Sequence, residues 1–143
     1  MPLLINPKSN VTLTPIGINI PIERGNTGYF SQTFDSVSQT KVNIINLLNT
    51  KRGERRFQPL FGSGLQNALF EQNLSSTPDI LKKIITDDIN NWIPNVNVVN
   101  VDLSLSNTEN NQLTDTYTVY IKVTFVVNNT MDSVNLVLQQ NNI

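Results

Sequence analysis

The chain contains neither cysteine nor histidine among its 143 residues. The absence of cysteine excludes thiolate nucleophiles and disulfides, and the two absences together exclude zinc sites of the usual kind. Without histidine the chain also lacks the commonest general base, the side chain that changes charge near neutral pH. An enzymatic function would therefore have to rely on carboxylates.

Charged residues and long apolar runs are also scarce. Charged residues make up 15% of the chain and the formal net charge is −1, so no overall field of either sign would attract nucleic acid or an anionic membrane. No stretch approaches the ~20 apolar residues of a membrane span, and the N-terminus lacks a basic leader followed by an apolar run. We therefore expect a soluble, cytoplasmically made protein that folds as one domain over residues 1–143.

The first part of the chain is rich in proline. Residues 1–28 contain four prolines, each of which removes a backbone donor and fixes its own φ, so this part is expected to form an extended arm. Within it, residues 17–22 alternate as in an edge strand, and 29–34 offer a second short strand or an irregular segment.

The middle of the chain has the 3.6-residue hydrophobic period of helices. The expected helices lie within 36–93 and cover 36–49, about 63–73 and 77–93. Asp35 or Ser36 is the candidate N-cap of the first helix. The third has Thr77 as N-cap and Pro78 at its first position, and Pro94 ends it.

After Pro94 the period changes to two, which is typical of strands with one covered face. Three strands are expected within 96–139, joined by a polar turn at 106–112 and another at Asn128 and Asn129. The doubled valine at 98–99 predicts a bulge or a two-sided strand. The sequence therefore predicts an α+β fold with an extended N-terminal arm, three helices and a C-terminal antiparallel β meander.

The carboxylates do not form a recognisable catalytic pattern. Glycoside hydrolysis needs two carboxylates facing each other across a cleft, and the acidic candidates are Glu23, Glu54, Glu71, Asp87 and Asp88. Asp87 and Asp88 point about 100° apart on a helix, so we interpret them as part of a solvated face. No nucleotide loop, metal-ligand spacing or nucleophile motif is present, and we assign no catalytic residue, metal or cofactor.

Four of the ten basic residues lie between 51 and 56, at the start of the stretch KRGERRFQPLFGSG. Three interpretations are open: cations that stabilise a helix C-terminus, a phosphate contact, or a clasp. In the clasp, Arg52, Arg55 and Arg56 would pair with Glu54 or with carboxylates of a partner. Arginine favours this interpretation, because its guanidinium can bind a carboxylate through two parallel hydrogen bonds.

The rest of this stretch is expected to fix the shape of the loop. Gly53 would permit a tight turn. Phe57, Leu60 and Phe61 would hold the loop against the core.

Several segments together carry a family resemblance. They are INLLNTKRGER at the end of the first helix, then PLFGSGLQNALFE, an amphipathic helix, a Trp-x-Pro junction and a meander of strands. In this order they resemble the small baseplate wedge proteins of contractile phage tails, which act as sheath initiators, and the TssE component of type VI secretion baseplates. The resemblance covers 36–138 and is most specific over 50–71. Ile93, Pro94 and Asn95 stand where that family commonly has Glu-Pro-Arg. This departure implies that more of the recognition rests on Arg52, Glu54, Arg55 and Arg56.

The resemblance implies a structural function in the baseplate of a virion tail, assembled in the host cytoplasm. The partners would be other wedge proteins and tail sheath protein, with several copies of the chain per baseplate and no nucleic acid, membrane, small-molecule substrate or cofactor. Some relatives are labelled lysozymes, so peptidoglycan hydrolysis is the alternative function. We expect the partner-binding residues to be Arg52, Glu54, Arg55, Arg56, Val134, Leu136 and Leu138.

The last three of these residues belong to the final expected strand. In the family, the initiator's sheet resembles that of the sheath subunit, and sheath subunits join by lending extended arms to each other's sheets. An exposed strand edge with few charges and no proline would accept such an arm. The other interpretation of this strand is that it only closes the domain core.

Overall fold

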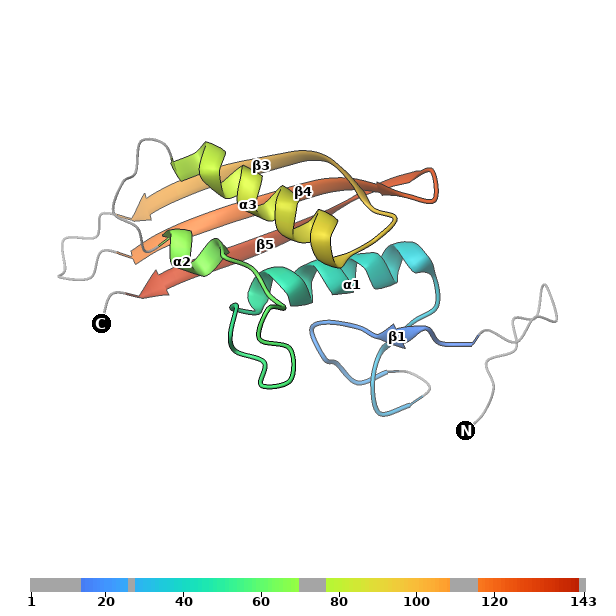
Figure 1. Cartoon of the computed structure of the whole chain (residues 1–143). Coiled ribbons are helices and arrows are strands. Elements are labelled where there is room, and N and C mark those ends of the chain that lie inside the picture. Colours follow the sequence, from blue (N-terminus) through green and yellow to red (C-terminus); the bar gives the residue numbers. More distant parts are fainter. Residues whose placement is uncertain (1–13, 26–27, 70–76, 109–115, 142–143) are drawn as a thin grey trace.

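The computed structural model describes residues 14–25, 28–69, 77–108 and 116–141 (Figure 1). Its elements are β1 (Gly17–Ile18), β2 (Gln32–Thr33), α1 (Ser36–Asn49), α2 (Leu65–Leu69), α3 (Thr77–Trp92), β3 (Asn97–Thr108), β4 (Thr116–Val127) and β5 (Thr130–Asn141). The three helices followed by a three-stranded meander confirm the predicted α+β fold.

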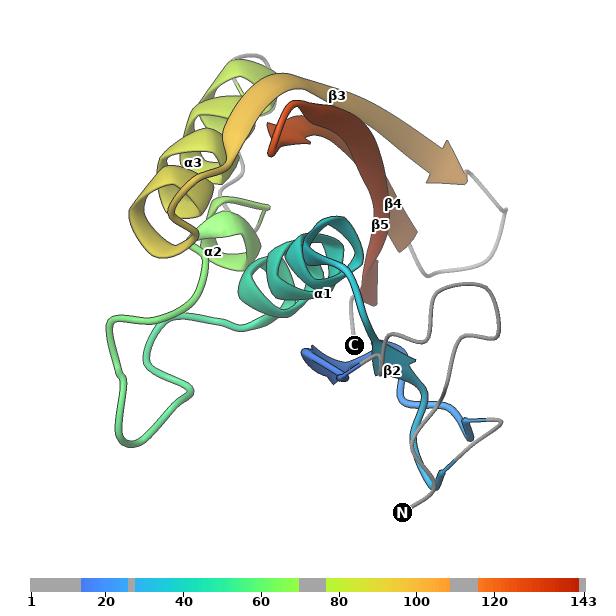
Figure 2. The same ribbon diagram turned by 90° about the vertical axis from the view of Figure 1, so that its right-hand side faces the viewer.

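The large sheet has the strand order β3-β4-β5, and both pairs of neighbours are antiparallel. The sheet is curved, and the three helices lie on its concave side (Figure 2). In this layer α3 lies toward β3 and α1 toward β5. The convex face of the sheet carries no helix among the described elements.

A two-residue turn fixes the register of β4 and β5. Asn128 and Asn129 have φ values of 48° and 62°, and the flanking residues Val127 and Thr130 are paired. Positive φ at both central residues is typical of the hairpin turn that matches the right-handed twist of strands, and asparagine tolerates it. The turn thereby directs the alternating apolar side chains of β4 toward the helices.

The predicted bulge is present in β3. The register of β3 against β4 shifts between Val98 and Asn100, which leaves Val99 as the extra residue. Val98 is partly buried and Val99 is exposed. The two valines therefore face different sides of the sheet, as a bulge requires.

The core lies between the helices and the concave face of the sheet. Its fully buried members from the helical layer are Ile44, Leu47, Leu48, Leu65, Leu81, Ile85 and Ile89, and those from the sheet are Ile121, Val123 and Phe125. The contributions of α1 and α3 recur at intervals of three and four residues, which places one apolar face of each helix on the sheet.

Local signals account for most helix ends. Asp35 caps α1, and its carboxylate accepts a hydrogen bond from the amide of Ser38 at 2.8 Å. The start of α3 agrees with the prediction to within one residue, and a last helical hydrogen bond joins the amide of Ile93 to the carbonyl of Ile89 at 2.8 Å. The described part of α2 ends at Leu69, so the expected extension to 73 lies outside the described residues.

The arm contains less strand than its alternation predicts. The expected strand over 17–22 is reduced to β1, which pairs with β2 through Gly17 and Ile18. Three further backbone bonds, each of 2.8 Å, join the two segments: the amide of Ile16 donates to Thr33, that of Asn19 to Ser31 and that of Ser31 to Glu23. Pro21 has no amide hydrogen to donate, so the regular strand ladder does not extend through it.

Candidate interaction surfaces

Asp88 on α3 is the centre of a buried polar network. Its side chain is 1% exposed, and its carboxylate accepts hydrogen bonds from the hydroxyl of Ser63 at 2.7 Å and the amide of Gly64 at 3.2 Å. The guanidinium of Arg52 forms an ion pair with the same carboxylate. The prediction that Asp87 and Asp88 form a solvated face is therefore correct for Asp87 and wrong for Asp88.

The same network explains where α2 begins. The hydroxyl of Ser63 donates to Asp88 and accepts from the amide of Leu65 at 3.1 Å. Amides at a helix start have no partner within the helix, and a serine hydroxyl satisfies one of them. Asp88 thus connects α3 to the N-terminus of α2. Through Arg52 it also connects α3 to the loop of residues 51–64, which we call the basic loop.

The arginines were expected to pair with Glu54 or with carboxylates of a partner, and the pairing with Glu54 is wrong. Among the described residues, the ion pairs are Arg52 with Asp88 and Lys41 with Asp132. Glu54 instead accepts a hydrogen bond from the amide of Lys51 at 3.0 Å. Its carboxylate therefore closes a local turn, and Arg52 reaches across 36 residues to an acid on another helix.

Two glycines adopt backbone conformations that the basic loop requires. Gly53 has φ +87° and Gly62 has φ +119°, values that favour glycine. A Cβ on Gly62 would lie 2.6 Å from the carbonyl oxygen of Thr50. The close approach arises because the two ends of the loop run side by side, with the amide of Ser63 donating to Thr50 at 2.8 Å.

Phe61 holds the loop against the helices. Its ring meets that of Trp92 edge to face, with centroids 5.2 Å apart, and the guanidinium of Arg55 lies 4.0 Å from the Phe61 ring centroid. Arg55 also contacts the amide oxygen of Asn46 at 3.4 Å. The expected anchoring role of Phe61 is thus present, whereas Arg56 lies exposed.

Phe57 and Leu60 do not hold the loop against the core, contrary to the sequence analysis. Phe57 is 98% exposed and Leu60 is 78% exposed. Apolar character alone does not distinguish these two side chains from Phe61, which is partly buried. The residues that fasten the loop are Arg52, Phe61 and Ser63, so Phe57 and Leu60 project from its tip.

The outer edge of β5 has a defined set of unpaired backbone groups. The two-residue turn makes Val127 and Thr130 a hydrogen-bonded pair, and such pairs alternate along an antiparallel ladder. Even-numbered residues of β5 therefore bond to β4. The residues whose amide and carbonyl groups point away from β4 are Met131, Ser133, Asn135, Val137, Gln139 and Asn141.

The side chains of β5 also alternate, with those of even-numbered residues directed toward the core and those of odd-numbered residues toward the other face of the sheet. Val134 and Leu136 are buried in the core and Leu138 packs against it. These three side chains therefore close the domain core, as one of the two interpretations held. Asn135 and Gln139 lie exposed on the other face, and Val137 is paired there with Tyr120 of β4.

A side-chain network protects the first part of this edge. The amide of Ser133 donates to the carboxylate of its neighbour Asp132 at 2.7 Å, and Lys41 of α1 pairs with that carboxylate at 2.7 Å. Both interactions lower the pKa of Asp132, the lysine contact more strongly. The unprotected part of the edge thus begins at Asn135.

The described carboxylates show no metal site. No group of three or more potential metal ligands occurs within the described ranges, and Glu71 lies outside them. In the described part of the chain, no helix combines the length and apolar character needed to cross a bilayer.

A family model described as baseplate wedge protein gp25 matches residues 35–131. The chain belongs to the gp25 family of baseplate wedge proteins. It is 25% identical over 100 residues to baseplate wedge protein gp25 of Enterobacteria phage T4, which covers 70% of each chain. The baseplate wedge family that the sequence resembles is therefore confirmed.

Two solved structures share the fold. A chain of the anti-feeding prophage baseplate aligns with a TM-score of 0.61 and 18% identity, covering 79% of this chain and 85% of the other. A putative tail lysozyme from Geobacter sulfurreducens aligns with a TM-score of 0.55 and 22% identity, covering 75% and 91%. At these identities the likeness shows the fold alone.

Proposed function

We propose that the chain is a non-enzymatic subunit of a contractile-tail baseplate wedge, and that it templates the first ring of tail sheath through the outer edge of β5. The role in a baseplate is supported by membership of the gp25 family. The role in sheath assembly is supported by one observation: β5 ends the sheet, and its second half is an unprotected edge.

The composition of β5 fits the acceptance of another strand. Residues 133–141 contain no charge and no proline, and these are the features by which natural edges avoid unwanted pairing. The outward groups of Asn135, Val137 and Gln139 recur every second residue, which sets the register of an incoming strand. Backbone hydrogen bonds would supply the affinity.

The opposite edge of the sheet is less suited to this role. β3 contains the bulge at Val99, which interrupts regular pairing. It also carries Asp102, which accepts a hydrogen bond from the side chain of Asn100 at 2.8 Å. Charges and bulges both discourage pairing at an edge. We therefore assign strand acceptance to β5.

Side chains on both faces beside β5 could select the incoming strand. On the helical side, a hollow of about 300 Å³ lies between α1, the arm and the sheet, and its apolar lining includes Ile20, Val42, Ile45 and Val134. On the convex side, the pair Tyr120 and Val137 is half exposed. An incoming strand with alternating apolar side chains would contact both.

Proline substitution tests the edge directly. Because Asn135 and Val137 both direct their amides outward, Asn135→Pro and Val137→Pro each remove one outward donor without removing a bond to β4. The matched control is Asn135→Ala, which shortens an exposed side chain and keeps the outward amide. Baseplates carrying the folded proline variants should fail to nucleate sheath in electron micrographs, whereas the alanine variant should nucleate it. Normal sheath on baseplates with either proline variant would rule out the templating role.

No observation favours peptidoglycan hydrolysis. The buried carboxylate of Asp88 is occupied by Arg52, Ser63 and Gly64, and Glu54 is an exposed turn residue. Purified protein should leave peptidoglycan intact in a turbidity assay. Clearing that is lost on replacing Glu54 or Glu71 would overturn the non-enzymatic assignment.

A further inference from the structure

The tip of the basic loop is an exposed apolar projection with a defined shape. The loop leaves the helical layer and extends away from the sheet (Figure 1). Three internal backbone hydrogen bonds shape it: the amide of Gly53 to the carbonyl of Pro59 at 2.9 Å, Glu54 to Lys51 at 3.1 Å, and Phe61 to Gln58 at 3.0 Å. Phe57 and Leu60 project from this bonded frame almost fully exposed.

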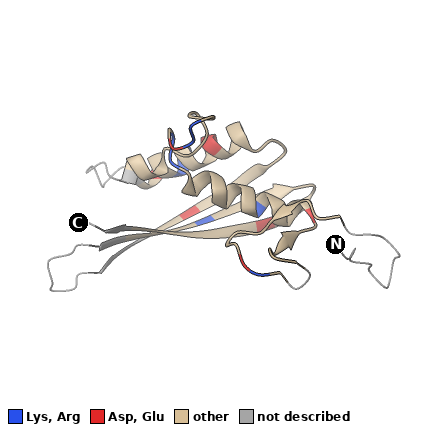
Figure 3. Cartoon of the chain, turned by 90° about the horizontal axis from the view of Figure 1, so that it is seen from below, with Lys and Arg blue, Asp and Glu red and all other residues tan. Residues whose placement is uncertain are grey.

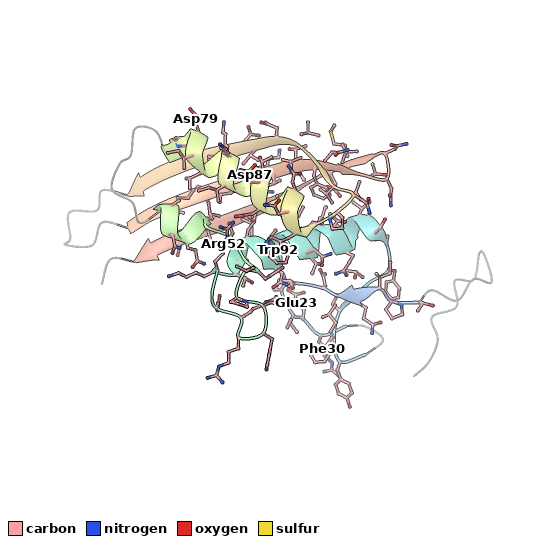
Figure 4. The ribbon with its side chains drawn as sticks, viewed as in Figure 1. Glu23, Phe30, Arg52, Asp79, Asp87 and Trp92 are labelled. Atoms are coloured by element: carbon pink, nitrogen blue, oxygen red, sulfur yellow. The ribbon has the colours of Figure 1, made fainter. Side chains whose placement is uncertain are left out.

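The base of the loop is fastened to two different elements. Arg52, labelled in Figure 4, joins it to Asp88 of α3, and Phe61 packs on Trp92 at the end of the same helix. Ser63 joins its two ends through Thr50. These contacts restrict the loop before any partner binds, so binding at the tip would cost little conformational entropy.

An exposed aromatic on a restricted loop is unfavourable for the isolated chain and favourable in an interface. Phenylalanine buries about 150–250 Å² when it is covered, and a few such anchors carry most of the energy of a protein interface. Phe57 and Leu60 contribute nothing to the domain core. Both side chains are therefore free to contact another molecule without any change in the domain core.

The surroundings of the tip are basic. The six residues 51–56 include four cationic side chains and one anionic side chain, although the formal net charge of the whole chain is −1. In the coloured ribbon of Figure 3, lysine and arginine accordingly gather in the loop, while most of the ribbon belongs to uncharged residues. At the base of the loop, an open hollow of about 470 Å³ is lined by polar residues that include Lys51, Arg52 and Glu54.

We propose that Phe57 and Leu60 insert into an apolar pocket with an acidic rim on another protein of the baseplate, whose carboxylates meet Lys51, Arg55 and Arg56. This inference rests on the proposed baseplate role and adds to it the surface and the chemistry of the partner. Two side chains alone cover far less than the ~800 Å² per partner of a stable interface. The tip is thus one anchor within a larger contact, as in a subunit of an assembly.

A second copy of this chain is a poorer partner. The hollow described beside β5 has a mixed lining in which Lys41 is paired with Asp132, and the carboxylate of Asp35 is already bonded to Ser38, so the hollow offers no free carboxylate to a basic tip. A bilayer is also a poorer partner, because one phenylalanine and one leucine give little insertion and the chain as a whole is slightly acidic.

The test uses particles from which the native chain has been deleted and to which variants are supplied in trans. Phe57→Ala with Leu60→Ala should leave the unfolding midpoint of the chain unchanged and reduce its amount in purified baseplates by about tenfold or more. Arg56→Glu should reduce it in a salt-dependent manner. The matched control is Ile80→Ala, which removes a 49% exposed apolar side chain from α3 and should assemble like the native chain.

A photo-crosslinking residue at position 57 identifies the contact. A cross-link to a different baseplate protein, at an apolar site flanked by acidic residues, is the expected result. A cross-link to a second copy, to phospholipid or to no molecule would overturn the inference, as would normal incorporation of the double variant. If the native chain itself is missing from baseplates, the proposed function fails as well, so the two failures are distinguishable.

Discussion

Arg52 and Asp88 meet across 36 residues of sequence, and the carboxylate of this pair is buried while the guanidinium is half exposed. The pair fixes the base of the basic loop to α3. Removing one partner of a buried ion pair is costly because the other groups lose their partners. The pair therefore makes the position of the loop depend on the packing of α3.

Asp88→Asn should lower the free energy of unfolding by about 2–4 kcal/mol, because the ion pair with Arg52 is lost and the bonds from Ser63 and Gly64 weaken. Urea unfolding followed by circular dichroism measures this change. Asp87→Asn at the exposed neighbour is the matched control and should stay within about 0.5 kcal/mol of the native chain. Equal effects of the two substitutions would mean that the network does not stabilise the fold.

Phe61→Ala should destabilise the chain by about 2 kcal/mol, less than for a fully buried phenylalanine, because the ring is only partly buried against Trp92. The control lies four residues away. Phe57→Ala should leave the unfolding midpoint unchanged, since its ring is exposed. Thermal unfolding of the two variants measures both effects. A loss of stability in Phe57→Ala comparable to that in Phe61→Ala would contradict the exposed position of Phe57.

Gly62→Ala should be more harmful than Gly53→Ala, although both glycines have positive φ. A Cβ at Gly53 meets no atom within 4 Å, so only the conformational cost of about 1 kcal/mol applies. At Gly62 the Cβ also collides with the backbone of Thr50 and Lys51. Chemical denaturation of the two variants gives the comparison, and an equal loss of stability would show that the ends of the loop can move apart.

Stability should decline in acid partly through Asp132. The pKa of its carboxyl is lowered from an ordinary 3.8, chiefly by the side chain of Lys41 and then by the amide of Ser133. A lowered folded-state pKa contributes stability above the unfolded-state value, and this stability is lost as the pH falls through the folded-state value. The loss falls below pH 3.8, so urea unfolding between pH 5 and pH 2 should show a shallower acid loss for Asp132→Asn than for the native chain. Identical slopes would mean that the contact with Lys41 is not kept in solution.

Periodic patterns predicted the elements of the fold well. The alternation along β4, the asparagine turn at 128–129 and the doubled valine of β3 each act through nearest neighbours and backbone conformation, which are visible in the sequence. The proline at 94 likewise ended α3 as expected. In the arm the same reasoning gave too long a strand, because pairing there depends on a partner segment and on the missing amide of Pro21.

The contacts of the basic loop could not be predicted in the same way. Neighbouring positions on a helix face different sides, but periodicity alone did not show that Asp88 lies beneath the loop while Asp87 faces solvent. The partner of Arg52 is fixed by how α3 packs beside the end of α1, which is a tertiary relationship. Likewise, Phe57 and Phe61 are alike in sequence, and only the path of the loop separates the exposed ring from the anchoring one.

The two edge strands of the sheet, β3 and β5, differ in how well they can pair with a further strand. β3 is interrupted by its bulge, whereas β5 presents regular donors and acceptors from residue 135 onward. Under the proposed role, the domain would therefore act as a seed for polymer growth at one edge only. A strand that joined β5 would end this growth unless it brought a new edge of its own. Such a seed would set where a polymer begins and in which direction it extends.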